Sequence, residues 1–166
     1  MVERHRNMNV MKSRSSIPSP PTTSFGYWLQ FRRECFGDCA RPYLRRWMLI
    51  VCGYSIRLHH WMRSDDDRFY HDHACDFISI VLKGIYYNHT PSGIFCIKAG
   101  QIWTAKARWR HYLKIPRKGA WTLMLCGRPY HKWGFYVPRT TDGVIRRLRP
   151  LDYFSRYGIR QVRGYQ

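Results

Sequence analysis

Short runs of apolar and aromatic residues recur along residues 46–137, and Gly- or Pro-containing segments separate many of them. Runs of this length, bounded by turn residues, predict β-strands rather than helices. Two hairpins are predicted, one at Gly53-Tyr54 and one at Pro91-Ser92-Gly93. The predicted strands cover residues 47–51, 55–62, 77–82, 86–90, 94–98, 102–105, 112–115, 121–126 and 133–137. Many short strands joined by tight turns are typical of an all-β sandwich or barrel.

The run 77–82 is apolar at nearly every position, which predicts a strand buried on both faces. The pattern differs at the two ends of the chain. Residues 1–25 are rich in Ser and Pro and predict a flexible tail, in which Met8 and Met11 offer alternative starts. Residues 26–35 are expected to form a short helix. We therefore divide the chain into a tail 1–25, a barrel domain 26–138 and a basic C-terminal extension 139–166, with a second short helix at 149–157.

Composition narrows the class of protein. A length of 166 residues fits one domain, and 7 Trp, 12 Tyr and 8 Phe argue against disorder of the whole chain. The net charge of +19, from 29 Lys and Arg against 10 Asp and Glu, predicts attraction to anions. The apolar run 47–52 is too short to cross a bilayer, so no membrane partner is expected. No secretory signal is present, so we expect a cytoplasmic protein.

The six cysteines contain no CxxC pair, so free thiols in a reducing compartment are the first expectation. A second metal site built from Cys35 and Cys39 with His59 or His60 is an alternative, although this spacing matches no zinc motif well.

Three histidines carry the strongest chemical signal. In a strand, side chains at i and i+2 share a face, so His71 and His73 point the same way. His111 follows a later predicted strand. Imidazole is the common protein ligand for Fe, Zn, Ni and Cu. We predict that His71, His73 and His111 hold a divalent transition metal, Fe(II) first, with Zn, Ni or Mn as alternatives.

Charged and aromatic residues near these histidines suggest a substrate site. Lys106, Arg108 and Arg110 alternate with Ala107 and Trp109, which on a strand gives one cationic face beside His111. This face could bind a small anionic ligand, or it could be a solvated outer surface. His60 and Trp133 are predicted as further substrate contacts. The acidic segment 65–67 could orient a ligand histidine or simply cap a loop.

With strands and histidines placed, the chain resembles the cupin superfamily. Its second motif, Gly-x5-Pro-x-Gly-x2-His, matches Gly100 to His111 in spacing, although the Pro and second Gly are replaced by Lys106 and Arg108. His71-Asp72-His73 matches the histidine pair of the first motif. The resemblance implies a double-stranded β-helix, the cupin jelly-roll barrel. It also implies a metal site on these histidines.

One departure concerns the glutamate of the first motif, because Phe77 occupies its position. Asp76 could replace it as a fourth ligand if a bulge turns it inward. Some three-histidine cupins are dioxygenases. A narrower resemblance, carried by segment 58–68, His71-Asp72-His73, Ala120-Trp121-Thr122-Leu123 and Trp133-Gly134-Phe135, is to small cupin-like proteins of bacteriophages.

Two classes of function follow. The first is a metal-dependent enzyme of oxygenase or isomerase type that acts on a small anionic substrate. The second is a non-catalytic module that binds a nucleotide or a signalling molecule, or binds nucleic acid through its charge, in a phage accessory or anti-defence role. A homodimer is expected, since cupins often pair through their barrel faces.

Overall fold

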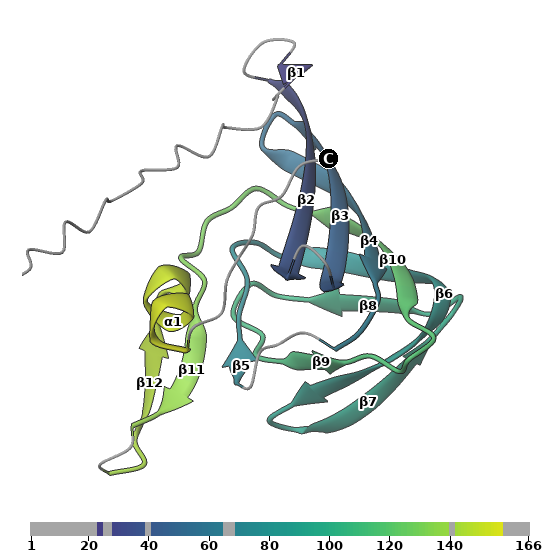
Figure 1. Cartoon of the computed structure of the whole chain (residues 1–166). Helices are drawn as coiled ribbons and strands as arrows, with labels where there is room; N and C mark the ends of the chain where they lie inside the picture. The colour runs from purple at the N-terminus through teal and green to yellow at the C-terminus, as the bar shows by residue number, and fades with distance from the viewer. Residues whose placement is uncertain (1–22, 25–27, 39–40, 65–68, 140–141, 158–166) are drawn as a thin grey trace, which may run out of the picture.

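The structure is a computed structural model that describes residues 23–24, 28–38, 41–64, 69–139 and 142–157. These residues form β-structure with one short helix (Figure 1). The predicted loop 65–67 and the last residues of the basic extension lie outside the described part, as does nearly all of the predicted N-terminal tail. The prediction that this tail is flexible therefore stays a prediction.

Two antiparallel sheets make up the architecture. One has nine strands, in the order β1-β2-β3-β4-β10-β6-β7, with β8 and β9 also paired to β6, and the other has the order β12-β11-β5. The elements are β1 (Thr23–Ser24), β2 (Leu29–Asp38), β3 (Arg41–Val51), β4 (Tyr54–Trp61), β5 (Tyr70–His71), β6 (Phe77–Thr90), β7 (Gly93–Lys98), β8 (Ile102–Ala105), β9 (Tyr112–Lys114), β10 (Ala120–Cys126), β11 (Phe135–Pro138), β12 (Ile145–Leu148) and α1 (Pro150–Tyr157). This all-β jelly-roll barrel is the fold class that the sequence predicts.

Both predicted hairpins are present, although the turn of the first lies one residue before the predicted Gly53-Tyr54. Cys52 and Gly53 connect β3 to β4 with positive φ angles of 48° and 84°, as the mirror-image turns of tight hairpins require. Pro91 and Ser92 connect β6 to β7. The long strand β6 bends at Gly84, whose φ is +83° and whose missing side chain leaves room for the carbonyl of Gly119. Because of this bend, β6 pairs with β8 and β10 in its first half and with β7 and β9 in its second.

The outer face of the large sheet is unexpectedly apolar. Leu49, Ile56, Leu125 and Ile78 stand in register on four neighbouring strands, and each is between 38% and 47% exposed. The prediction that 77–82 is buried on both faces is therefore wrong. Its alternate residues face outward, as do those of β3, β4 and β10. The inner faces of the same strands carry the polar residues described below.

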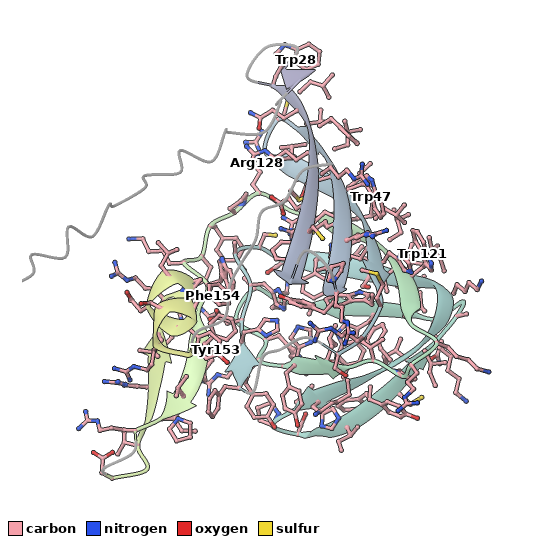
Figure 2. All side chains as sticks on the ribbon, in the orientation of Figure 1. Trp28, Trp47, Trp121, Arg128, Tyr153 and Phe154 are labelled. Carbon is pink, nitrogen blue, oxygen red and sulfur yellow. The ribbon has the colours of Figure 1, made fainter. Side chains whose placement is uncertain are left out.

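The second sheet and α1 form a separate layer beside the barrel mouth (Figure 1). Tyr153 of α1 is fully buried and stacks on Phe135 of β11, with ring centroids 3.8 Å apart. Figure 2 shows Tyr153 and Phe154 on the side of α1 that faces β11. The predicted C-terminal helix is thus confirmed, and β12 is a strand that the sequence pattern did not indicate.

The helix predicted at residues 26–35 is wrong, because the described part of this segment forms β2. Each residue of β2 from Leu29 to Asp38 pairs with β3, and this long ladder outweighs the weak local helix preference. In the described part of the chain, no helix has the length and apolar character that spanning a membrane requires.

Candidate metal centre

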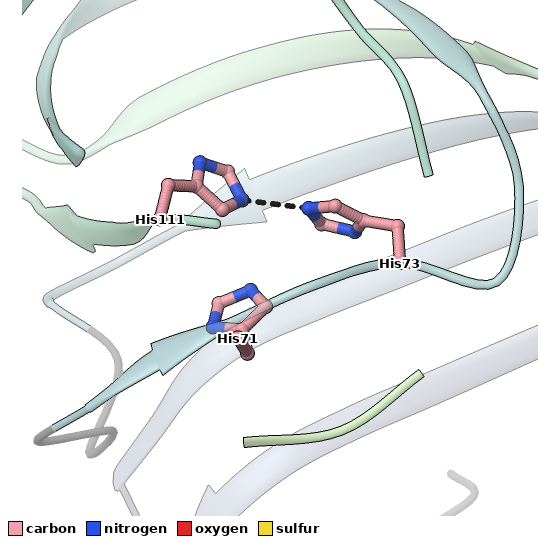
Figure 3. Close-up of side chains that lie close together, drawn as sticks. All are labelled: His71, His73 and His111. Atoms are coloured by element: carbon pink, nitrogen blue, oxygen red, sulfur yellow. Dashed lines mark hydrogen bonds between the residues drawn. The ribbon is translucent and has the colours of Figure 1, made fainter. Parts of the chain in front are cut away.

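His71, His73 and His111 come together at the junction of the two sheets, as predicted. One ligand atom from each lies within 4.8 Å of the others. The ring centroids of His71 are 5.3 Å from His73 and 4.9 Å from His111, and those of His73 and His111 are 4.8 Å apart. Figure 3 shows the three rings turned toward a common point. This spacing suits three imidazoles that share one metal ion.

The backbone fixes this arrangement. His71, at the end of β5, and His111, just before β9, form a bridge in which each amide donates to the other's carbonyl, at 2.9 and 3.0 Å. The amide of His73 donates to the carbonyl of Ala107 at 2.7 Å. All three histidines are thus held by hydrogen bonds between segments that lie far apart in the sequence.

The three imidazoles are neutral near pH 7. Burial lowers the pKa of His71 to about 4. Burial, followed by the charges of neighbouring groups, lowers the pKa values of His73 and His111 well below the ordinary value. A neutral imidazole offers the lone pair that a metal ion needs, so protons do not compete strongly for these ligands.

Asn88 on β6 orients one of the ligands. It is fully buried, and its Oδ1 lies 2.6 Å from His111 Nδ1. With Oδ1 as the acceptor, Nδ1 carries the proton and Nε2 keeps its lone pair toward the centre. His111 Nε2 lies 2.8 Å from His73 Nε2, so these two nitrogens already face each other (Figure 3).

Asp72 anchors the segment that carries the histidine pair. This fully buried carboxylate accepts hydrogen bonds from the Gly134 amide at 2.6 Å, His131 Nε2 at 2.7 Å and the Tyr136 hydroxyl at 2.9 Å. Arg147 Nε lies 3.2 Å from it. Burial alone would raise the pKa of Asp72, but the hydrogen bonds, that of His131 first, hold it below its usual value. Asp72 therefore ties the end of β5 to β11 and β12 as a charged group.

Asp76 is not part of this group. Its carboxylate accepts hydrogen bonds from the Tyr130 hydroxyl, from Lys106 Nζ at 2.9 Å and from the Ala107 amide at 2.8 Å. These hydrogen bonds, that of Tyr130 first, lower the pKa of Asp76 to about 2. The proposed bulge that would turn Asp76 toward the histidines does not occur, because Asp76 instead fixes the loop after β8.

The predicted cationic strand beside His111 is also corrected. Residues 106–110 form a turn and not a strand, so Lys106, Arg108 and Arg110 do not share one face. All three are exposed, and Arg110 lies over the ring of Tyr136 at 4.2 Å. Lys106 is paired with Asp76. None of the three lines the cavity that contains the histidines.

Of the other two predicted substrate residues, Trp133 lies at the site and His60 does not. Trp133 lines the cavity, with its ring centroid 6.5 Å from that of His71. His60 stacks on Trp121, at 4.1 Å between ring centroids, on the face of β4 that points away from the cavity. Its neighbour His59 faces inward instead. Cys39, part of the alternative second metal site, lies outside the described residues.

A cavity of about 430 Å³ extends from the three histidines into the barrel. Its walls include Arg46, Arg57 and Glu34 on the inner faces of β2, β3 and β4, together with the buried His59. The sequence pattern did not point to Glu34, Arg46 or Arg57, and it indicated His59 only for the alternative second metal site. A usable signal was the alternation Ser55, Arg57, His59 along β4, since it places polar side chains on one face and apolar ones on the other.

No protein-family model and no curated protein matches the chain. Among solved structures, the chain is similar to FeII HppE, with a TM-score of 0.50 and 10% identity over 58% of this chain and 56% of that one. A cupin-2 domain protein from Shewanella frigidimarina aligns with a TM-score of 0.38 and 18% identity over 47% of this chain and 72% of that one. AerE from Microcystis aeruginosa aligns with a TM-score of 0.46 and 13% identity over 72% and 60%.

The chain spans little more than half the length of HppE, and at these identities the likeness concerns the fold alone. The resemblance to bacteriophage proteins stays a prediction. From the arrangement of its strands and its likeness to HppE, we conclude that the chain folds as a jelly-roll barrel.

Proposed function

We propose that this protein is a metal-dependent enzyme that acts on a small anionic substrate inside its barrel. The observation that carries the proposal is the convergence of three neutral, largely buried imidazoles on one end of an internal cavity. The Nε2 atoms of His73 and His111 lie 2.8 Å apart, so without a metal they can share one hydrogen bond. With a cation bound between the rings, each nitrogen would instead offer its lone pair to the ion.

His71, His73 and His111 would hold the ion, with His111 oriented by Asn88. Three protein ligands leave positions open, and a divalent metal bound there would supply Lewis-acid or oxygen-activating chemistry. Fe(II) is the first candidate to test, because HppE, whose fold is similar, is described as an FeII protein. Zn(II), Ni(II) and Mn(II) also suit imidazole ligands.

The chain's own residues shape the reaction space. Trp133 and Phe135 pack around His71, with ring centroids 6.5 and 5.7 Å from it, and they limit the access of water from that side. Phe77 lies edge-on to His73, with centroids 4.7 Å apart, at the position where the cupin motif has glutamate. The metal would therefore have no protein carboxylate at this position, so its complex would keep a higher positive charge and favour an anionic substrate.

The test is the metal content of untagged protein purified without oxygen, beside a His71→Ala/His111→Ala variant. We expect close to one transition metal ion per chain in the wild type and its loss in the variant, with both proteins folded by circular dichroism. Oxygen consumption in the presence of candidate substrates then distinguishes an oxygenase from an isomerase. A folded wild type that binds none of the four metals would exclude the proposal, whereas metal without turnover would favour a binding module.

A further inference from the structure

We propose that Arg57 and His59 form a carboxylate-binding subsite in the same cavity, which selects small monocarboxylate substrates with an apolar stem. This inference rests on the proposed function for its biological meaning, since the substrate's other end would reach the three histidines. The subsite itself is argued from the lining of the barrel alone.

The register of the sheet places Arg57 in an apolar surrounding. Its partners on the neighbouring strands are Met48 on β3 and Met124 on β10, and all three residues line the cavity. Among the described residues, Arg57 makes one hydrogen bond, from Nε to Ser55 Oγ at 2.9 Å. The two Nη groups thus lack acceptors among the described residues.

The carboxylates of the cavity wall already form ion pairs with other side chains. Glu34 accepts two hydrogen bonds from Arg46, its cross-strand neighbour, and Asp72 is bonded to His131 and Arg147. Arg57 has no carboxylate partner in the part of the chain that the structure describes. A partly buried guanidinium without a counter-ion is costly, and a bound anion removes that cost.

His59 supplies a second, independent sign of a ligand. Its side chain is 4% exposed, and both ring nitrogens are buried without a hydrogen-bond partner. Its cross-strand neighbours are Arg46 and Thr122, and its ring meets Trp61 edge-on with centroids 5.6 Å apart. Buried polar groups are almost always paired, so two unpaired nitrogens that line a cavity indicate a missing partner. A neutral His59 can donate one hydrogen bond to a carboxylate oxygen.

The charge balance and the shape of the cavity define the ligand. Among the arginines and carboxylates that line the cavity, Arg46 pairs with Glu34, Asp72 pairs with Arg147, and Arg32 is exposed, so Arg57 leaves one positive charge, which matches a monoanion. The planar guanidinium suits the two oxygens of a carboxylate. The methionines beside it suit an aliphatic stem, and about 430 Å³ accommodates a small molecule rather than a polymer.

The experiment measures binding of butyrate to the full chain after metal removal by a chelator, using isothermal titration or ligand-observed NMR. Butanol and inorganic phosphate serve as comparison probes. We expect butyrate to bind about tenfold or more tightly than butanol. Arg57→Met should weaken butyrate by about tenfold or more, and His59→Phe by several-fold. Arg110→Met is the matched control, because it removes the same charge from the outer surface and should leave butyrate affinity unchanged.

A second measurement separates ligand binding from a structural role. Without ligand, Arg57→Met should unfold at the same or a higher urea concentration than the wild type, because it removes an uncompensated cation. An Arg57 that merely supports the fold would give a lower midpoint. The His71→Ala/His111→Ala variant should still bind butyrate, so the subsite can be confirmed even if the protein binds no metal.

Three results would overturn the inference. These are no butyrate binding by the wild type, equal affinities of Arg57→Met and wild type, and a preference for phosphate over butyrate. The last would assign the subsite to a different class of anion.

Discussion

Replacing Asn88 by leucine tests how the fold prepares His111 for a metal ion. The change keeps the branching and the number of heavy atoms of a fully buried side chain and removes the Oδ1 acceptor that lies 2.6 Å from His111 Nδ1. The ligating form of His111 has its proton on Nδ1, and in the variant this buried N–H has no partner. An unsatisfied buried donor costs about 1–3 kcal/mol, which corresponds to a loss of metal affinity of roughly five- to 150-fold.

The stability of the metal-free protein should fall by less than this free energy. Without a metal, His111 can move its proton to Nε2 and donate it to His73 Nε2, which lies 2.8 Å away. In urea unfolding with chelator present, the loss in free energy of unfolding should therefore be smaller than the loss in free energy of metal binding. Asn88→Asp is the matched control, because it keeps an acceptor at the same position and strengthens the ligand basicity of His111.

The assay is a competition titration of Zn(II) against a chromophoric chelator near pH 7.5, with wild type, Asn88→Leu and Asn88→Asp measured side by side. We expect Asn88→Leu to lose about ten- to 100-fold in affinity and Asn88→Asp to remain within a few-fold of the wild type or above it. A folded Asn88→Leu that binds Zn(II) as tightly as the wild type would refute the reasoning. Equal losses in both variants would assign Asn88 to packing and not to hydrogen bonding.

Further predictions concern stability. The pKa of His71 is about 4 in the folded protein, whereas a histidine in the unfolded chain titrates near pH 6.5. Between these two pH values, His71 binds a proton in the unfolded chain but not in the folded one. The free energy of unfolding of the metal-free protein should therefore fall by about 3 kcal/mol from this residue as the pH falls from 6.5 to 4. Urea unfolding across this range checks it, and a flat profile would contradict it. Gly84→Ala should lower the free energy of unfolding by about 2 kcal/mol or more, because φ is +83° and the new Cβ would lie 2.4 Å from the Gly119 carbonyl oxygen. Thermal unfolding measures this, and an unchanged melting temperature would show that β6 does not need this bend. Tyr153→Ala should destabilise the protein by about 3–5 kcal/mol and expose α1 to proteolysis, since Tyr153 is fully buried against Phe135. The conservative Tyr153→Phe should retain most of the stability. Equal losses in both variants would show that the hydroxyl, and not the packing of the ring, stabilises this contact.

The sequence predicted most strands because hairpin turns have strong local signals. Gly53 and Pro91-Ser92-Gly93 are residues that particular turn geometries demand, so the hairpins around them could be placed correctly. β2 and β12 were missed for the opposite reason. Each is stabilised mainly by its ladder with a neighbouring strand, and such long-range pairing has no local signature.

The direction in which side chains face was harder to predict. The run 77–82 is apolar at nearly every position, so Ile78 was expected in the core. Here the interior is partly polar, because it contains a cavity with Arg57 and His59, and some apolar residues of the same strands, such as Ile56 and Ile78, lie outside. The cations of segment 106–110 were misplaced for another reason, because this segment forms a turn and not the expected strand.

The three histidines were predictable because a motif with fixed spacing requires them together, whereas their supporting residues were not. Asn88 and Asp72 are ordinary polar residues in the sequence, and their roles depend on contacts across 23 and up to 75 positions of the chain. Such contacts are set by the packing of the two sheets, which no local pattern encodes.

The polar interior also explains why the site lies between two apolar clusters. Polar groups that are buried inside the barrel without a hydrogen-bond partner lower the stability of the fold, and apolar packing elsewhere must offset this cost. On one side, Leu113 and Ile115 follow His111 into a core with Val81, Tyr86 and Ile97. On the other side, Phe135 packs with Val137 and Tyr153 beside His71. The bridge joins His71 to His111, and each of these two residues is therefore anchored next to its own apolar cluster. This packing holds the ligands rigidly, although the cavity beside them is not filled by side chains.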